Sequence, residues 1–222
     1  MDAPEQPAAL ADLGAVLLDM DGTLVDSDAA VERAWATWAL EHGVAPSAAL
    51  EHAHGSPADL TVRRLLPDLD DAAVRTAAAR QLALQYDDLS DVVATPGSGA
   101  LVAALERRGL PWAVVTSADR PLAAARLGAG AVDPPLLVTV EDVERGKPDP
   151  EGFLLAARRL GVAPGRCLVV EDSAPGLAAG RAAGMRVAAL KGLAGDVPRP
   201  GASLRDLGEL ADLLAAPLGE PA

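Results

Sequence analysis

The chain has 222 residues, a net charge of −13 and a hydrophobic content of 50%, and these values exclude several classes of protein. The apolar content is typical of a globular chain, and the length suits one or two domains with a sizeable core. The acidic balance argues against nonspecific binding to nucleic acids or anionic membranes, because both require a basic surface.

The N-terminal residues 1–14 are acidic and lack the basic segment and apolar core of a signal peptide. No apolar run approaches the roughly 20 residues that a membrane-spanning helix requires. The single cysteine, Cys167, excludes an internal disulfide and lies in an apolar run, where we interpret it as a small buried residue. We therefore expect a cytoplasmic protein without a membrane or nucleic-acid partner.

The first predicted strand, residues 14–19 (GAVLLD), ends in a carboxylate. The segment LLDMDGTLVDS places Asp19, Asp21 and Asp26 within eight residues and has no basic side chain between them. Carboxylates this close repel one another, so we expect a nearby cation to offset their charge. A serine and a helical pattern follow Asp26, which favours a turn residue over a catalytic acid at that position.

Residues 27–93 contain no convincing strand, and we predict a helical insert there. Helical patterns cover residues 28–43, 57–67 and 70–89. Trp35 and Trp38 are three residues apart in the first pattern, where packing inside the insert is favoured over a platform that stacks on a sugar. The segment ATPGSG, residues 94–99, is predicted to be the hinge at which the chain leaves the insert.

Beyond this hinge, short apolar runs alternate with helical patterns. Further strands are predicted at residues 112–117, 136–140, 167–172 and 186–190, and a final amphipathic helix at residues 203–217. Several of the intervening stretches begin with Ser or Asp and end in Gly, as capped helices do. This alternation predicts an α/β fold, a Rossmann-like doubly wound parallel sheet that binds ligands beyond the carboxyl ends of its strands.

Polar side chains gather at that edge of the predicted sheet. They are Asp19 and Asp21, Thr116 and Ser117, Lys147, and Glu171 with Asp172. Several carboxylates in one crevice fit a hard divalent cation such as Mg²⁺, which binds carboxylates, water and a substrate phosphate. Beside such a cation, one aspartate can attack phosphorus and a second carboxylate can protonate the leaving oxygen. A lysine and a hydroxyl can hold the phosphoryl oxygens.

Four segments in this order resemble the motifs of the haloacid dehalogenase-like (HAD) hydrolases. They are DMDGTLVDS, VVTSA, GKPDPEGF and VVEDSAPG. The resemblance spans residues 14 to about 190 and implies an α/β core with an inserted α-helical cap domain. It assigns residues 1–26 and 94–222 to the core and residues 27–93 to the cap.

The resemblance also implies a role for each motif residue. Asp19 is the expected nucleophile, which forms an aspartyl-phosphate. Asp21 is the expected general acid and then base, with its backbone carbonyl on Mg²⁺. Lys147 is expected to neutralise the nucleophile and the phosphate.

The remaining motif positions are assigned to phosphate and metal. Thr116 is the preferred match for the phosphoryl-binding residue, with Ser117 next. Asp172 is the expected main Mg²⁺ ligand of the fourth motif, with Glu171 second and bound through water.

The segment HAHGSPADL resembles a turn that reaches over the active site in related sugar and polyol phosphatases. His54 and Gly55 either contact the leaving group there or belong to an ordinary loop. Ser56 stands where those relatives often have Arg or Lys, so this turn lacks a charged contact to the substrate unless Arg63 or Arg64 supplies one.

Among the reactions of this family, the residues favour hydrolysis of a phosphomonoester. A dehalogenase does not need Asp21, and residues 27–92 lack the lysine of a phosphonate-cleaving relative. A β-phosphoglucomutase-like enzyme usually has a histidine where this chain has Val31. A non-catalytic binding protein would be expected to have lost a motif residue, and none is lost.

We therefore predict a Mg²⁺-dependent phosphatase that acts on a small phosphorylated metabolite, a sugar or polyol phosphate, as a monomer or weak homodimer. A β-phosphoglucomutase-like mutase and a phosphoglycolate-type phosphatase remain alternatives.

Overall fold

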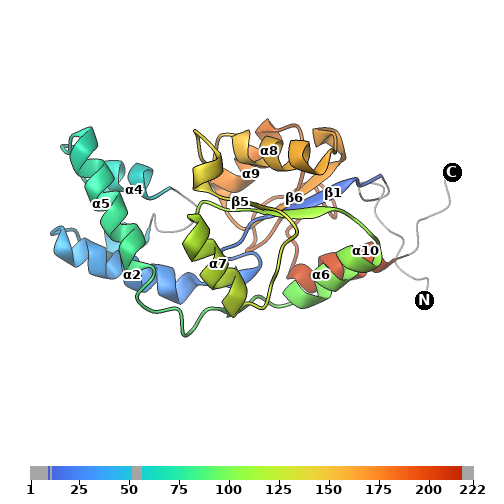
Figure 1. Cartoon of the computed structure of the whole chain (residues 1–222), viewed down its shortest axis with the longest axis horizontal. Coiled ribbons are helices and arrows are strands. Elements are labelled where there is room, and N and C mark those ends of the chain that lie inside the picture. The colour runs from blue at the N-terminus through green and yellow to red at the C-terminus, as the bar shows by residue number, and fades with distance from the viewer. Residues whose placement is uncertain (1–9, 11, 52–56, 217–222) are drawn as a thin grey trace.

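A computed structural model describes residues 10, 12–51 and 57–216 of the chain, and within them five parallel strands form the central sheet (Figure 1). The strands are β1 (Ala15–Leu18), β4 (Trp112–Val115), β5 (Leu137–Val138), β6 (Cys167–Glu171) and β7 (Arg186–Ala189). Their order is β5-β4-β1-β6-β7. The chain thus moves outward from β1 in one direction and later returns to its other side. This topological switch point is where parallel sheets form ligand crevices.

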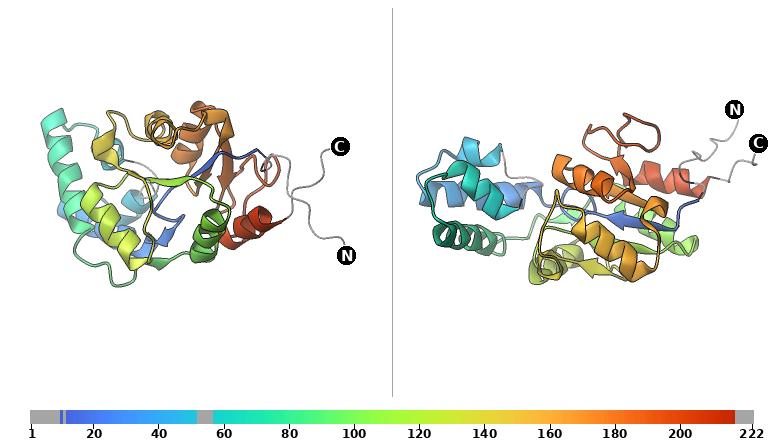
Figure 2. Two further views of the ribbon diagram at one scale, coloured as in Figure 1. Left: turned by 45° about the vertical axis from the view of Figure 1, so that its right-hand side comes forward. Right: turned by 90° about the horizontal axis from the view of Figure 1, so that it is seen from above.

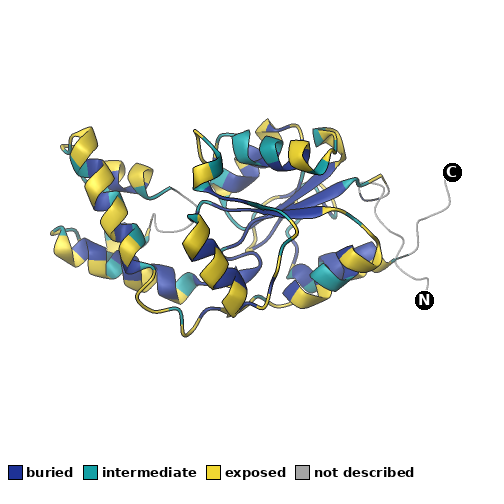
Figure 3. Cartoon of the chain, in the orientation of Figure 1, coloured by how far each residue is buried: buried dark blue, intermediate teal, exposed yellow. Residues whose placement is uncertain are grey.

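Helices cover both faces of the sheet, which explains why its strands are continuous apolar runs. Helices α8 (Glu151–Leu160) and α9 (Ala174–Ala182) cover one face. Helices α6 (Ser98–Arg107), α7 (Arg120–Ala129) and α10 (Leu207–Ala215) cover the other. Alternate β1 residues face the two layers, and Figure 3 shows the sheet buried between them. The predicted α/β fold is therefore the observed one.

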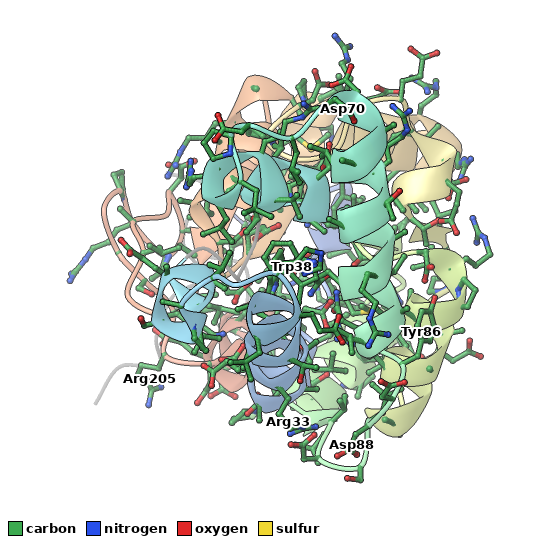
Figure 4. All side chains as sticks on the ribbon, turned by 90° about the vertical axis from the view of Figure 1, so that its left-hand side faces the viewer. Arg33, Trp38, Asp70, Tyr86, Asp88 and Arg205 are labelled. Carbon is green, nitrogen blue, oxygen red and sulfur yellow. The ribbon has the colours of Figure 1, made fainter. Side chains whose placement is uncertain are left out.

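A separate group of helices lies at one end of the sheet, as Figure 2 shows from two further directions. It contains α2 (Asp28–Glu41), α3 (Pro46–Leu50), α4 (Ala58–Leu65) and α5 (Asp71–Leu84), which we call the helical body. Its apolar cluster surrounds Trp35 and Trp38, whose rings meet edge to face at 5.2 Å. The Nε1 group of Trp38, at the centre of Figure 4, donates a hydrogen bond of 2.8 Å to the Ala77 carbonyl. Both tryptophans are therefore packed inside the helical body, as we expected, and Trp35 also borders the cavity described below.

Two short antiparallel strands connect the helical body to the sheet. They are β2 (Val25–Asp26) and β3 (Val93–Ala94). The sequence pattern did not indicate β3, because a two-residue strand is too short to show an alternating pattern. It is defined by its pairing with β2. Gly97 follows it with φ +82°, and a Cβ at Gly97 would lie 1.9 Å from the Gly208 nitrogen. Only glycine fits where α6 and α10 approach each other.

The strand predicted at residues 136–140 is shorter than expected, because side-chain hydrogen bonds end it at Val138. The Thr139 backbone N–H and hydroxyl donate to Asp142 Oδ2 at 3.0 and 3.1 Å. These bonds start the 3-10 helix η1 (Val140–Asp142), and a second short one, η2 (Pro164–Arg166), precedes β6. No helix in the described part of the chain is long and apolar enough to cross a membrane.

Candidate active site

The carboxyl ends of β1, β4 and β6 open into a cavity of about 320 Å³ between the sheet and the helical body. From the sheet side it is lined by Asp19, Asp21, Thr116, Ser117, Lys147 and Asp172. From the helical body it is lined by residues that include Val31, Trp35, Gln81 and Gln85. The structure thus brings six of the residues predicted from the motifs to one cavity wall.

Lys147 is buried between two carboxylates and uses all three of its ammonium protons. Its Nζ is paired with Asp19 Oδ1, lies 2.6 Å from Glu171 Oε1 and donates a 3.0 Å bond to the Val115 carbonyl. Burial alone would lower the pKa of Lys147, but the charges of Asp19 and Glu171 raise it above its usual range. Lys147 is therefore a fixed positive charge against the side of Asp19.

Asp19, Glu171 and Asp172 form a carboxylate cluster whose candidate ligand oxygens lie within 4.8 Å of one another. Burial raises the pKa of Asp19 well above its usual range, and the charge of Glu171 raises it further. The same two causes raise the pKa of Asp172. Lys147 thus leaves part of the negative charge uncompensated, and a divalent cation with oxygen ligands would offset the rest.

Both oxygens of Glu171 already accept hydrogen bonds within the protein. Oε1 accepts from Lys147, while Oε2 accepts from the backbone N–H and the hydroxyl of Ser173 at 3.1 and 2.8 Å. A Cβ at Gly176, in the first turn of α9, would lie 1.8 Å from Oε1. Asp19 and Asp172 are therefore the carboxylates best placed for direct contact with a cation.

Asp172 also has a lysine partner that the motif analysis missed. Lys191 Nζ lies 3.1 Å from Asp172 Oδ2 and 2.8 Å from Asp28 Oδ2, at the start of the helical body. Gly22 has φ +77°, and a Cβ there would lie 2.0 Å from Asp172 Oδ2. The glycine of the first motif therefore allows Asp172 to approach the loop that carries Asp21.

Asp21 points away from the carboxylate cluster. Its Oδ1 accepts a 2.6 Å hydrogen bond from the Ser27 hydroxyl and forms a 2.8 Å ion pair with Arg126 Nη1. Its side chain is 28% exposed and lines the cavity. Residues two apart in a strand face the same side, but β1 ends at Leu18 and the chain turns between Met20 and Leu24, so Asp19 and Asp21 have separate environments.

The predicted phosphate-binding hydroxyls lie beyond β4. Thr116 is buried, and its Oγ1 accepts a 3.0 Å hydrogen bond from the Ala118 backbone N–H. Ser117 lines the same cavity. His54 and Gly55 lie outside the described residues.

Arg126 and Gln85 also line the cavity, and the motifs did not point to them. A sequence signal existed for Arg126, because it shares a helical face with Leu122, Ala123 and Leu127. An arginine on an apolar face requires a buried partner. The sequence could not show that this partner is Asp21.

Comparisons with known proteins show the family of this chain. Residues 13–184 match the family model of the haloacid dehalogenase-like hydrolases. The chain belongs to this family. It is 44% identical to hexitol phosphatase A of Escherichia coli (strain K12) over 184 residues, which cover 82% of this chain and 85% of that protein.

One further sequence and one solved structure are similar to this HAD-family chain. It is 33% identical to 2-deoxyglucose-6-phosphate phosphatase 1 of Saccharomyces cerevisiae, over 76% of each chain. A haloacid dehalogenase-like hydrolase structure from Bacteroides fragilis superposes with a TM-score of 0.77 at 21% identity, over 89% of this chain and 99% of that one. The predicted family and the prediction of a phosphatase are confirmed.

Proposed function

We propose that this HAD-family phosphatase hydrolyses small phosphorylated sugars or polyols through an aspartyl-phosphate, with Mg²⁺ as its cofactor. The observation that carries the proposal is the buried Asp19–Lys147 pair beside Asp172 in the cavity wall. The names of two similar proteins, a hexitol phosphatase and a 2-deoxyglucose-6-phosphate phosphatase, support this substrate class.

In the first proposed step, a carboxylate oxygen of Asp19 attacks phosphorus and the ester P–O bond breaks. Asp21 gives its proton to the leaving oxygen. In the second step, Asp21 takes a proton from water, whose oxygen attacks phosphorus and releases phosphate and the Asp19 carboxylate. Lys147 orients and neutralises Asp19, while Thr116 and Ser117 hold phosphoryl oxygens.

Asp19 and Asp172 would hold Mg²⁺ directly, with the Asp21 backbone carbonyl, and Glu171 would act through water. The fit rests on the clustered oxygen donors and on the charge that Lys147 leaves uncompensated. When bound, the ion supplies positive charge to the nucleophile and to the phosphoryl oxygens.

The proposal also assigns the parts of the chain to a cap domain and a core domain. Residues 27–93 would form the cap and residues 1–26 and 94–222 the core, with the substrate's organic part against the cap. Val31 lines the cavity and cannot accept a proton from an attacking sugar hydroxyl, which supports hydrolysis over a mutase. We also propose a cytoplasmic monomer or weak homodimer.

Changing Asp19 to Asn tests the reaction. With 4-nitrophenyl phosphate and Mg²⁺, we expect kcat/KM to fall by about 10⁴-fold or more. Asp26→Asn is the matched control in the same segment, because among the described residues the Asp26 side chain accepts one hydrogen bond, from the Asp28 backbone N–H at 3.2 Å. Retained hydrolysis by Asp19→Asn would refute the mechanism.

A phosphate-release screen tests the substrate class. It would compare sugar, polyol and nucleotide phosphates with phosphoglycolate. A preference for phosphoglycolate or nucleotides would overturn the sugar and polyol assignment. Conversion of β-glucose 1-phosphate to glucose 6-phosphate with a bisphosphate primer, and without free phosphate, would indicate a mutase.

A further inference from the structure

Arg126 is the one fully buried arginine among the residues that the structure describes, and it lies in the wall of the active-site cavity. Its side chain is 1% exposed. Burying a guanidinium is costly unless charge and hydrogen bonds compensate it. An arginine at a core position of a helix therefore requires partners that offset this cost, and the contacts of Arg126 identify them.

Those contacts join two parts of the protein. Nη1 of Arg126 lies 2.8 Å from Asp21 Oδ1, and Nη2 donates a 2.8 Å hydrogen bond to Gln85 Oε1. Gln85 caps the C-terminus of α5 in the helical body. Arg126 itself is on α7, which packs on the sheet. The guanidinium thus connects the expected general acid with the end of a helix on the other side of the cavity.

The contact restricts Asp21 to one arrangement of its two oxygens. Oδ1 receives Arg126 Nη1 and the Ser27 hydroxyl, at 2.8 and 2.6 Å. Two donors on one oxygen, 2.6 and 2.8 Å away, hold the carboxylate plane in place. Oδ2 is then the oxygen left to exchange a proton with the substrate or with water.

Gln85 extends this arrangement into the helical body. Arginine can only donate, so the oxygen of the Gln85 amide must face Arg126. The Gln85 Nε2 group then donates to Gln81 Oε1 at 2.8 Å. Gln81 is also buried and lines the cavity. One chain of hydrogen bonds therefore runs from the wall of the helical body to the general acid.

We propose that Arg126 is a positioning residue for the acid–base step: it holds Oδ1 of Asp21, presents Oδ2 to the substrate, and links this placement to the helical body through Gln85. The inference rests on the proposed function of Asp21. Asp19 attacks without help from Arg126, so removal of Arg126 should weaken proton transfer more than attack on phosphorus.

Two aryl esters separate these effects without a sugar substrate. Nitrophenolate leaves as a stabilised anion, whereas phenolate depends more on a proton from Asp21. For Arg126→Met, we expect kcat/KM to fall about 100-fold with phenyl phosphate and about 10-fold with 4-nitrophenyl phosphate. Arg126→Lys should recover part of the loss with phenyl phosphate, and Gln85→Leu should shift the same ratio less, by about threefold.

Asp21→Asn supplies the second half of the test, because it removes the group that Arg126 positions. In an Asp21→Asn background, Arg126→Met should lower kcat/KM by less than about threefold, because both variants impair the same step, proton transfer by Asp21. This pair also removes both charges together, so neither the Asp21 carboxylate nor the buried Arg126 guanidinium is left without its partner. Arg120→Met is the control on the same helix, because Arg120 pairs with Asp142 outside the cavity.

Equal losses with the two esters, or full additivity with Asp21→Asn, would overturn the role of Arg126. If the wild-type protein hydrolyses neither ester, the proposed function fails instead. Thermal unfolding of each variant, measured in the same buffer, separates a loss of folded protein from a loss of catalysis.

Discussion

The two buried cations of the site hold their aspartates in different ways. Lys147 has its three contacts within the sheet region, with Asp19, Glu171 and the Val115 carbonyl. Arg126 divides its contacts between Asp21 and the helical body. Asp19, the proposed nucleophile, is thus held from the sheet side alone, whereas the cation that holds Asp21, the proposed general acid, is itself bound to the helical body.

This difference indicates which steps depend on the position of the helical body. The bonds that hold Lys147 against Asp19 would persist if the helical body moved, because no described residue of that body forms a hydrogen bond or ion pair with Lys147. The surroundings of Asp21 would change, because Gln85 would leave Arg126. Under the proposed roles, the Gln85–Arg126 contact makes proton transfer depend on the position of the helical body. Lys191, which contacts both Asp172 and Asp28, links the proposed metal site to that body as well.

Among the variants that test this difference between the two cations, the largest effect is expected from Lys147→Met. The change removes the charge that orients Asp19 and leaves Glu171 without its cation. We expect kcat/KM to fall by about 10³-fold and the free energy of unfolding to fall by about 3 kcal/mol. The value of kcat/KM is measured with 4-nitrophenyl phosphate, and the free energy of unfolding is measured by urea denaturation.

Lys191→Met is the matched control, because Lys147 and Lys191 are the two lysines of the chain. Lys191 is 42% exposed and contacts Asp172 rather than Asp19, so its loss should cost less than about tenfold. Equal losses in the two variants would remove the distinction between a buried, orienting cation and a peripheral one.

A smaller effect is expected from Asp172→Asn, and it should appear in metal binding. The amide loses the negative charge that a hard cation prefers. We expect the affinity for Mg²⁺ to fall by about 10- to 100-fold, in a calorimetric titration without substrate. Asp212→Asn, at an exposed position of α10, should not change the titration. An unchanged affinity in Asp172→Asn would place the metal elsewhere.

How much of this site the sequence could reveal depends on how its residues are placed. Asp19, Thr116 and Glu171 each lie at the end of an apolar strand, so local pattern and parallel topology are enough to bring them together. Lys147 lies in the loop after β5, so the same strand pattern places it at this edge as well. The assigned roles of these residues remain predictions.

The contacts that cross between the two bodies could not be predicted, because they depend on how separate elements pack. Arg126 and Gln85 are 41 positions apart, and neither belongs to a motif. The strand β3 likewise exists only because β2 pairs with it. Such features depend on how the helical body is placed relative to the sheet, and the local patterns of a single sequence do not specify that placement.

The smallest effect is expected from Tyr86→Phe, which removes one contact between the bodies. Tyr86 follows α5, and Figure 4 shows it beside α7, where its hydroxyl lies 2.5 and 2.6 Å from the two Asp119 oxygens. Burial and the hydrogen bond to Asp119 raise the pKa of Tyr86 to about 12, so the phenol keeps its proton at neutral pH. Its partly exposed position limits the loss of kcat/KM to about threefold, carried by KM, because Asp19 and Lys147 are untouched. A loss confined to kcat would instead indicate that this contact, like that of Arg126, acts on the chemical step.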